Sequence, residues 1–174
     1  MAAKEAAASS GGRVKGGTNA NAAAAEVIVL TIPYEGLRDT LLHLEQQIGK
    51  RIVISTVVPL RFHEGRLSMM ATQMGSAAED IQLLLPQAQV VSAFQTLAAR
   101  KLADLSQTPE GDVVVCSDHP AAAREVMELA ETIGLRGVNA GPLFNSRYVE
   151  GITALLVSVN RIHRKETGIK IVGL

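Results

Sequence analysis

The chain has 174 residues, with 17 Lys and Arg against 17 Asp and Glu, so its formal net charge is zero. This balance excludes a large nucleic-acid or anionic-membrane footprint, because binding to phosphate groups requires an excess of Lys and Arg. Hydrophobic residues make up 47% of the chain, which suffices for a core, and one Cys excludes a disulfide scaffold. No apolar run reaches the roughly 20 residues that a membrane helix needs, and we expect a soluble, cytoplasmic protein.

Strands and helices are predicted to alternate from residue 27 onward. Val27–Ile32 is a continuous apolar run closed by Pro33, which predicts a strand buried on both faces. Apolar residues at spacings of 3 and 4 predict a helix over 35–48 that ends near Gly49. A second strand is predicted over 51–55, and residues 56–73 are expected to form a long loop.

The same alternation continues through the second half of the chain. Ser76-Ala-Ala-Glu79 has the spacing of a capping box at a helix start, and strands are predicted over 90–94, 112–116 and 136–139. Asp118 is the expected N-cap of a helix that begins at Pro120 and ends near Gly134. A last helix from about residue 145 carries an apolar stripe of Val149, Ile152, Leu155, Leu156 and Val159. Together these elements predict an α/β fold with a mostly parallel sheet.

An ordered set of short motifs resembles one enzyme family, the NADPH-dependent reductases of the deazaflavin coenzyme F-420. The set comprises Thr31-Ile-Pro-Tyr-Glu35, Val57-Val-Pro-Leu60, Gly75-Ser-Ala-Ala-Glu79, Val91-Ser-Ala-Phe-Gln95, Asp112-Val-Val-Val-Cys-Ser-Asp118, Ala140-Gly-Pro-Leu-Phe-Asn-Ser-Arg-Tyr-Val-Glu150 and Gly168-Ile-Lys-Ile-Val-Gly-Leu174. The resemblance extends over residues 13–174. It implies direct hydride transfer between NADP(H) and 8-hydroxy-5-deazaflavin (coenzyme F-420), with no catalytic acid, nucleophile or metal. It also implies a homodimer formed through the C-terminal helices.

The resemblance also predicts how the chain is organised. Members of the family open with a strand, a Gly-rich turn, a helix and a second strand, which together hold the phosphates of NADP. By comparison this sequence begins inside the next helix, and we expect a Rossmann-like sheet that lacks its first strands. Residues 1–25 are the expected remnant of a helix and loop, 26–140 a partial NADP-binding domain, and 141–174 a C-terminal segment with the deazaflavin pocket and dimer contact. Gly16-Gly17-Thr18-Asn19 does not replace the Gly-rich turn, because no buried strand precedes it.

Cofactor-binding residues are implied by the same resemblance. Those expected to contact the nicotinamide nucleotide follow the first two strands: Ile32, Pro33, Tyr34, Gly36, Val58 and Pro59. Those expected to form the floor between the nicotinamide and deazaflavin rings follow the third strand: Gln95, Leu97, Ala99 and Lys101. Those expected on the deazaflavin side lie on the last helix: Asn145, Arg147, Gly151 and Thr153. Some relatives have His at position 95 and Ser at position 151.

Simpler interpretations of these residues stand beside the functional ones. Ile32–Tyr34 also fits a buried strand end, Gln95 a surface amide, and Arg147 with Glu150 an i,i+3 ion pair on a helix. Two alternative functions also remain. One is another NADP-dependent reductase of the superfamily, with an imine or ferric acceptor, and the other is a non-catalytic dimerising remnant.

Overall fold

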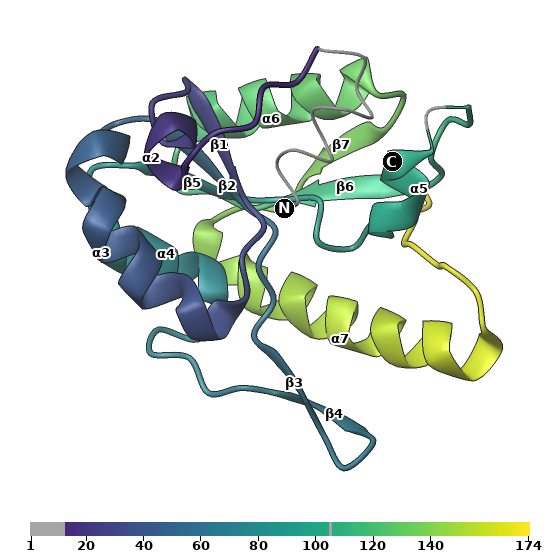
Figure 1. Ribbon diagram of the computed structural model, residues 1–174. Coiled ribbons are helices and arrows are strands. Elements are labelled where there is room, and N and C mark those ends of the chain that lie inside the picture. The colour runs from purple at the N-terminus through teal and green to yellow at the C-terminus, as the bar shows by residue number, and fades with distance from the viewer. Residues whose placement is uncertain (1–12, 105) are drawn as a thin grey trace.

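The computed structural model describes residues 13–104 and 106–174 (Figure 1). The predicted N-terminal remnant therefore lies partly outside the described residues, at 1–12. The strands are β1 (Val27–Leu30), β2 (Ile52–Ser55), β3 (Leu60–His63), β4 (Arg66–Met69), β5 (Gln89–Ser92), β6 (Asp112–Val115) and β7 (Arg136–Asn139). The helices are α2 (Asn19–Ala22), α3 (Leu37–Ile48), α4 (Ala77–Leu84), α5 (Ala99–Ala103), α6 (Pro120–Thr132) and α7 (Ser146–His163), with short 3₁₀ turns η1 (Tyr34–Gly36) and η2 (Leu143–Asn145).

The central sheet is mostly parallel, as the alternation of elements predicts. Strands β1, β2 and β5 are parallel neighbours, with Leu30 opposite Ser55 and Ser55 opposite Ser92. Strands β6 and β7 form a second parallel pair. An antiparallel bridge between Ser92 and Cys116 joins the two groups, so β6 and β7 run opposite to the first three strands.

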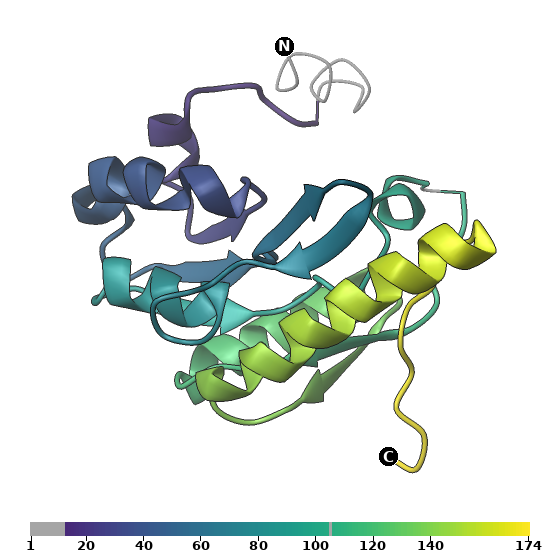
Figure 2. The same cartoon turned by 90° about the horizontal axis from the view of Figure 1, so that it is seen from below.

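Helices cover both faces of this sheet (Figures 1 and 2). One core packs α3 and α4 against β1, β2 and β5, and the other packs α6 against β2, β5 and β6. The expectation that β1 is buried on both faces is wrong. The core beneath α6 contains no residue of β1, so Val27 and Val29 remain 38% and 49% exposed at the edge of the sheet.

The long loop expected over 56–73 is also wrong, because much of it is a β-hairpin. Strands β3 and β4 pair antiparallel, and Glu64 and Gly65 between them both have positive φ, 49° and 77°. Two left-handed residues form the tight turn whose twist matches that of a hairpin. The hairpin starts just after β2 and projects past α7 on the side away from the central sheet (Figure 1).

Two details of the C-terminal half also differ from the sequence patterns. The N-cap of α6 is His119 rather than Asp118, whose Oδ1 instead accepts a hydrogen bond of 3.0 Å from Leu143 N. The apolar stripe expected on α7 divides between two faces. Val149 is buried against β6, whereas Ile152 and Leu155 are 39% and 63% exposed. Among the described residues, no helix is long and apolar enough to cross a membrane.

Candidate functional site

The carboxyl ends of β1, β2 and β5 bring three of the predicted segments together. Ile32–Pro33 follows β1, Val58–Pro59 follows β2, and Gln95–Leu97 follows β5. Because the last residues of these strands are register partners, the three segments leave the sheet at one edge. That edge is where ligands bind in open α/β sheets. The sheet thus assembles most of the residues expected to contact the nicotinamide and the floor.

Gln95 is the most informative side chain at this edge. It is buried rather than a surface amide, and its Nε2 donates a hydrogen bond of 2.7 Å to Ser92 Oγ. Its Oε1 is buried and has no hydrogen-bond partner among the described residues. A buried carbonyl oxygen without a partner costs about 1–3 kcal/mol, so the position suits a ligand that donates an N–H group. Both the nicotinamide carboxamide and the deazaflavin ring carry such donors.

A strained backbone turn places Gln95 at this position. Phe94 has a φ of 69°, in the left-handed region that non-glycine residues seldom adopt. Such a conformation costs on the order of 1–3 kcal/mol and is found preferentially at functional sites. The turn at Phe94, directly after β5, and the Gln95 oxygen without a partner among the described residues make the end of this strand a candidate binding site.

Tyr34 is held in place by a buried carboxylate. Its hydroxyl donates a hydrogen bond of 2.6 Å to Asp80 Oδ2, and Asp80 also accepts from Gln73 N and Met74 N. Burial and the neighbouring Asp80 raise the pKa of the Tyr34 hydroxyl, so it stays neutral. Its ring lines a pocket of about 380 Å³ beside α3 and α4. Gly36 precedes the first turn of α3, in the same loop as Tyr34.

The first turns of α7 are bonded to the start of α4. Ser146 Oγ donates to Ser76 Oγ at 2.7 Å, and Arg147 binds both carboxylate oxygens of Glu79 at 2.7 and 2.8 Å. Glu150 accepts hydrogen bonds from the first two amides of α4, Ala77 N at 2.9 Å and Ala78 N at 3.1 Å. The predicted i,i+3 ion pair between Arg147 and Glu150 is therefore wrong, because each side chain bonds to α4 instead. We call this set of contacts the α4–α7 clamp.

Glycine is required at position 75, directly before the first residue of the clamp. Gly75 has a φ of 122°, and a Cβ there would lie 2.5 Å from the guanidinium of Arg147. Arg147 also donates to Met74 O and lies 3.9 Å above the ring of Phe144. A side chain at position 75 would displace Arg147, so the Gly at the start of the motif Gly75-Ser-Ala-Ala-Glu79 is explained by close packing.

Glu150 is a buried carboxylate whose pKa is shifted toward neutrality. The residue is 1% exposed, and burial raises the pKa of its carboxyl to about 7, although the two amide hydrogen bonds oppose the shift. Glu79 and Asp80 nearby raise it further. The sequence pattern placed Glu150 only in an ion pair with Arg147, and it did not single out Asp80. Each carboxylate lies on the buried face of an amphipathic helix, where the pattern calls for an apolar residue. This mismatch is the signal in the sequence that points to a buried carboxylate at positions 80 and 150.

The other residues predicted on the last helix, of which Asn145 is the N-cap of α7, differ in how open their surroundings are. Asn145 Nδ2 donates to Ala140 O at 2.6 Å, and buried Thr153 bonds to Val149 O within its own helix. Gly151, by contrast, has open space where a Cβ would lie. Of the four residues predicted on α7, Gly151 leaves room for a ligand to approach the helix.

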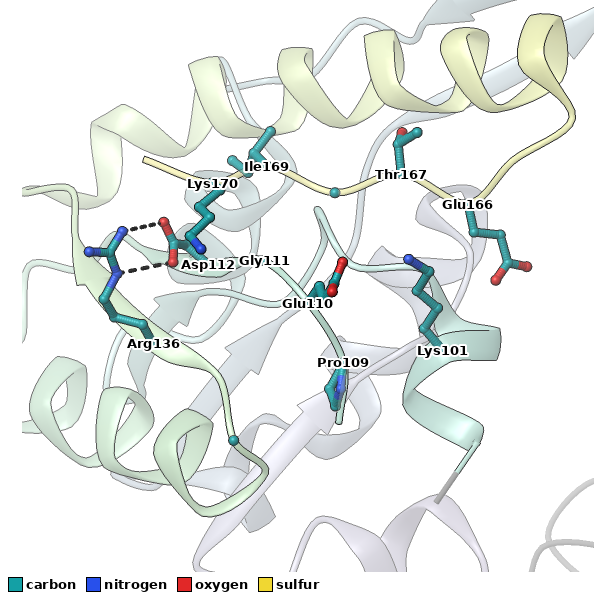
Figure 3. Close-up of a pocket in the computed structure, with 12 residues that line it drawn as sticks. Lys101, Pro109, Glu110, Gly111, Asp112, Arg136, Glu166, Thr167, Ile169 and Lys170 are labelled. Atoms are coloured by element: carbon teal, nitrogen blue, oxygen red, sulfur yellow. Dashed lines mark hydrogen bonds and ion pairs between the residues drawn. The ribbon is translucent and has the colours of Figure 1, made fainter. Parts of the chain in front are cut away.

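A pocket of about 740 Å³ lies next to α5 and the C-terminal segment (Figure 3). Lys101, expected in the floor of the site, lines this pocket, whereas Ala99 is exposed two residues earlier on α5. A small hollow lined by Leu97 and Lys101 adjoins it. Among the charged residues that line it, Asp112 and Arg136 pair with each other (Figure 3).

Asp112 and Arg136 fasten the C-terminal segment to the sheet. Arg136 binds both oxygens of the buried Asp112, at 3.0 and 2.6 Å, and donates to Ile171 O. Asp112 also accepts from Ile171 N at 2.6 Å, and the Arg136 guanidinium holds the pKa of Asp112 below its ordinary value.

We therefore expect Asp112→Asn to lower the free energy of unfolding by about 2 kcal/mol. The change removes the charged partner of Arg136, and an amide accepts fewer hydrogen bonds from Arg136 and Ile171 N than a carboxylate does. Amide hydrogen exchange at Ile171 should become faster at the same time. Chemical denaturation and exchange measured by NMR test this, with Asp39→Asn on exposed α3 as the control. Unchanged exchange at Ile171 would show that the pair does not hold the segment.

No group of three or more His, Cys, Asp or Glu side chains in the described ranges could hold a metal ion. Cys116 is buried in the sheet, and burial raises the pKa of its thiol to about 11, which makes it a poor nucleophile. The site therefore consists of hydrogen-bonding and apolar groups at a sheet edge. Such a site can position two ligands and exclude water between them.

Known proteins with similar sequences agree on one family. A family model described as "NADP oxidoreductase coenzyme F420-dependent" matches residues 2–59. The F420-dependent NADP reductase of Methanocaldococcus jannaschii is 36% identical over 153 residues, which are 86% of this chain and 69% of that protein. The enzyme of the same name from Methanothermobacter thermautotrophicus is 36% identical over 168 residues, or 92% of this chain and 72% of that protein.

Solved structures agree with the fold. A protein of Arthrobacter sp. FB24 superposes with a TM-score of 0.81 at 22% identity, covering 90% of this chain and 74% of that one. A protein of Sinorhizobium meliloti superposes with a TM-score of 0.67 at 26% identity, covering 82% and 69%.

The parallel strands, the helices on both faces and the ligand edge define a Rossmann-like α/β protein. At 36% identity over most of its length, the chain belongs to the family of coenzyme F420-dependent NADP oxidoreductases.

Proposed function

We propose that this chain transfers a hydride between NADP(H) and the deazaflavin coenzyme F-420. The family relationship supports the pair of cofactors, and the observation at the site that carries the proposal is the buried, unpartnered Oε1 of Gln95 at the ligand edge. Nicotinamide and deazaflavin rings both exchange two electrons as hydride, so the chemistry is supplied by the cofactors. The protein has to hold the two rings face to face in a site without water.

Two groups of residues would hold the two rings, one group for the nicotinamide and one for the deazaflavin. Ile32, Pro33, Tyr34, Gly36, Val58 and Pro59 would hold the nicotinamide nucleotide at the sheet edge, and Gln95 and Leu97 would form the floor, with Ala99 and Lys101 beyond it on α5. Gly151 on α7 would offer a flat backbone surface to the deazaflavin, with Asn145, Arg147 and Thr153 fixing the position of the helix. Gln95 has no charge to lose, so the site should work without a titrating group at this position.

A direct test uses NADPH that carries deuterium at the transferred position of its ring. With oxidised deazaflavin in ordinary water, the purified chain should move the label into the reduced deazaflavin, because a hydride does not exchange with solvent. Calorimetric titration with deazaflavin, with and without NADPH, should show saturable binding. A folded chain that binds neither cofactor would favour the non-catalytic alternative. Oxidation of NADPH by a cyclic imine or ferric complex, but not by deazaflavin, would favour the other reductases.

Gly151 offers a further test of the deazaflavin wall. Because a Cβ fits there without contact, Gly151→Ser should tighten deazaflavin binding about fivefold through one added hydrogen bond. Gly151→Ala is the matched control, since both variants stabilise the helix by roughly 0.5–1 kcal/mol. The two variants should differ in their calorimetric affinity for deazaflavin but not in their free energy of unfolding. Equal affinities in Ser and Ala variants would remove position 151 from the pocket.

We also propose that the protein works as a cytoplasmic homodimer. One face of α7 carries Tyr148, Ile152, Leu155 and Ile162, which are 62%, 39%, 63% and 75% exposed. Their spacings of 4, 3 and 7 form the continuous seam along which two helices pack. The last turn of α7 and the two residues after the helix carry Arg161, Arg164 and Lys165. Antiparallel pairing of two α7 helices keeps these cations apart, whereas parallel pairing would bring them together.

A further inference from the structure

The β3–β4 hairpin has an apolar face that is only partly covered. Phe62 lies opposite Leu67 and Leu60 opposite Met69, so these four side chains share one face. Phe62 and Met69 remain 57% and 42% exposed. The hairpin pairs with no other described strand, and an isolated two-stranded hairpin is marginally stable in water. An exposed apolar face on such an element therefore calls for a partner that covers it.

The hairpin is held against the second half of α7. Arg161 Nη1 donates to Gly65 O at 3.3 Å, and its guanidinium lies 5.2 Å from the centre of the Phe62 ring. Figure 2 shows the hairpin lying alongside α7, and strand β4 contacts the helix. Figure 1 shows that the hairpin extends beyond α7 on the side away from the sheet. The hairpin therefore lies beside any chain that packs against the exposed face of α7.

The flank of α7 that faces the hairpin also carries Gly151. Residues 151, 154, 158 and 161 follow spacings of 3, 4 and 3, so Gly151 and Arg161 lie on the same side of the helix. A two-fold axis between two antiparallel α7 helices keeps that flank on the same side in both protomers. If Leu155 lies at the centre of the pairing, Gly151 lies opposite Val159 of the partner subunit, beside the partner's hairpin.

From this geometry we propose that the hairpin of each protomer reaches across the dimer and covers the region around Gly151 on the partner's α7. The apolar face around Phe62 then forms a wall of the partner's pocket for a flat ring. The pocket is complete only in the dimer. The nature of that ring, a deazaflavin, rests on the proposed hydride transfer, whereas the contact between hairpin and partner helix rests only on the proposed homodimer.

Cross-linking between two variants tests the contact without any ligand. A Phe62→Cys protein is mixed with a Gly151→Cys protein, so that a disulfide between the two new positions must join two chains. We expect a covalent dimer on a non-reducing gel from this mixture. Neither variant alone should give one, and the native Cys116 is buried. Phe62→Cys mixed with Leu129→Cys is the control, because Leu129 is exposed on α6, which covers the opposite face of the sheet.

Three results would overturn the contact. They are a monomer by light scattering, a dimer whose paired variants do not cross-link, and equal cross-linking with the Leu129→Cys control. The role of the hairpin in the pocket has its own measurement. Phe62→Ala should weaken calorimetric binding of oxidised deazaflavin about tenfold, and Leu129→Ala should leave it unchanged. Cross-linking together with unchanged affinity would keep the interface and reject the pocket wall. Failure of the unaltered chain to bind deazaflavin would count against the proposed function alone.

Discussion

The free energy of unfolding should fall by about 2.5 kcal/mol as the pH rises from about 5 to 8, and Glu150→Gln should abolish most of this change. Burial places the pKa of Glu150 at about 7 in the folded chain, against an ordinary value of 4.5. The folded state therefore holds a proton that the unfolded state releases between these values. The resulting stabilisation is complete below pH 4.5 and is lost as the pH rises through 7.

Urea denaturation at several pH values measures this effect. The informative quantity is the difference between the unaltered chain and Glu150→Gln at each pH, because other groups that titrate cancel in it. Glu128→Gln on the exposed face of α6 is the control and should keep the full slope. A slope that survives in Glu150→Gln would mean that Glu150 is ionised throughout. The two amides of α4 would then stabilise its charge more than burial opposes it.

Leu155→Asp should convert the proposed dimer to a monomer, with at least about a hundredfold rise in the dissociation constant. Leu155 is 63% exposed at the centre of the apolar seam on α7. In a symmetric antiparallel pair this residue faces its own copy, so one substitution introduces two carboxylates at the same place. Because the side chain is exposed in the single chain, the folded monomer should survive the change.

Sedimentation or light scattering over a range of concentrations measures this dissociation. Leu129→Asp is a matched control, an equally drastic change at a leucine that is 42% exposed on α6. A Leu155→Asp protein that remains dimeric would place the interface elsewhere. Loss of the dimer together with loss of the circular dichroism spectrum would show that Leu155 supports the fold itself.

Local sequence patterns predicted the elements that have a strong local signal. The helical spacing of Leu37, Leu41 and Ile48 located α3, and the apolar run after Arg51 located β2. The hairpin was missed because its turn is Glu64-Gly65, without the Asn-Gly or Asp-Gly that usually marks one. The exposed side of β1 was missed because burial depends on which helices cover the strand.

Only those parts of the site that follow from the order of the strands along the chain could be predicted. Residues after neighbouring parallel strands must meet at one edge, and Ile32, Val58 and Gln95 do so. The partners of Arg147 and Glu150 could not be predicted, because they lie 68 and 73 positions earlier in the chain. The local spacing of Arg147 and Glu150 suggested a pair on one helix instead. The left-handed turn at Phe94 carries no signal in a pattern of apolar and polar residues.

The α4–α7 clamp also sets the order in which the protein can complete its fold. The first two amides of α4 obtain their carboxylate from Glu150, more than 70 residues later. Ser76 and Glu79 can cap the helix locally during synthesis, but Ala77 N and Ala78 N gain their carboxylate partner only once α7 has been made. Contacts between such distant segments slow folding, and partly folded chains expose apolar surface meanwhile. The hydrogen bonding at the start of α4 is thus completed only after α7 has been made.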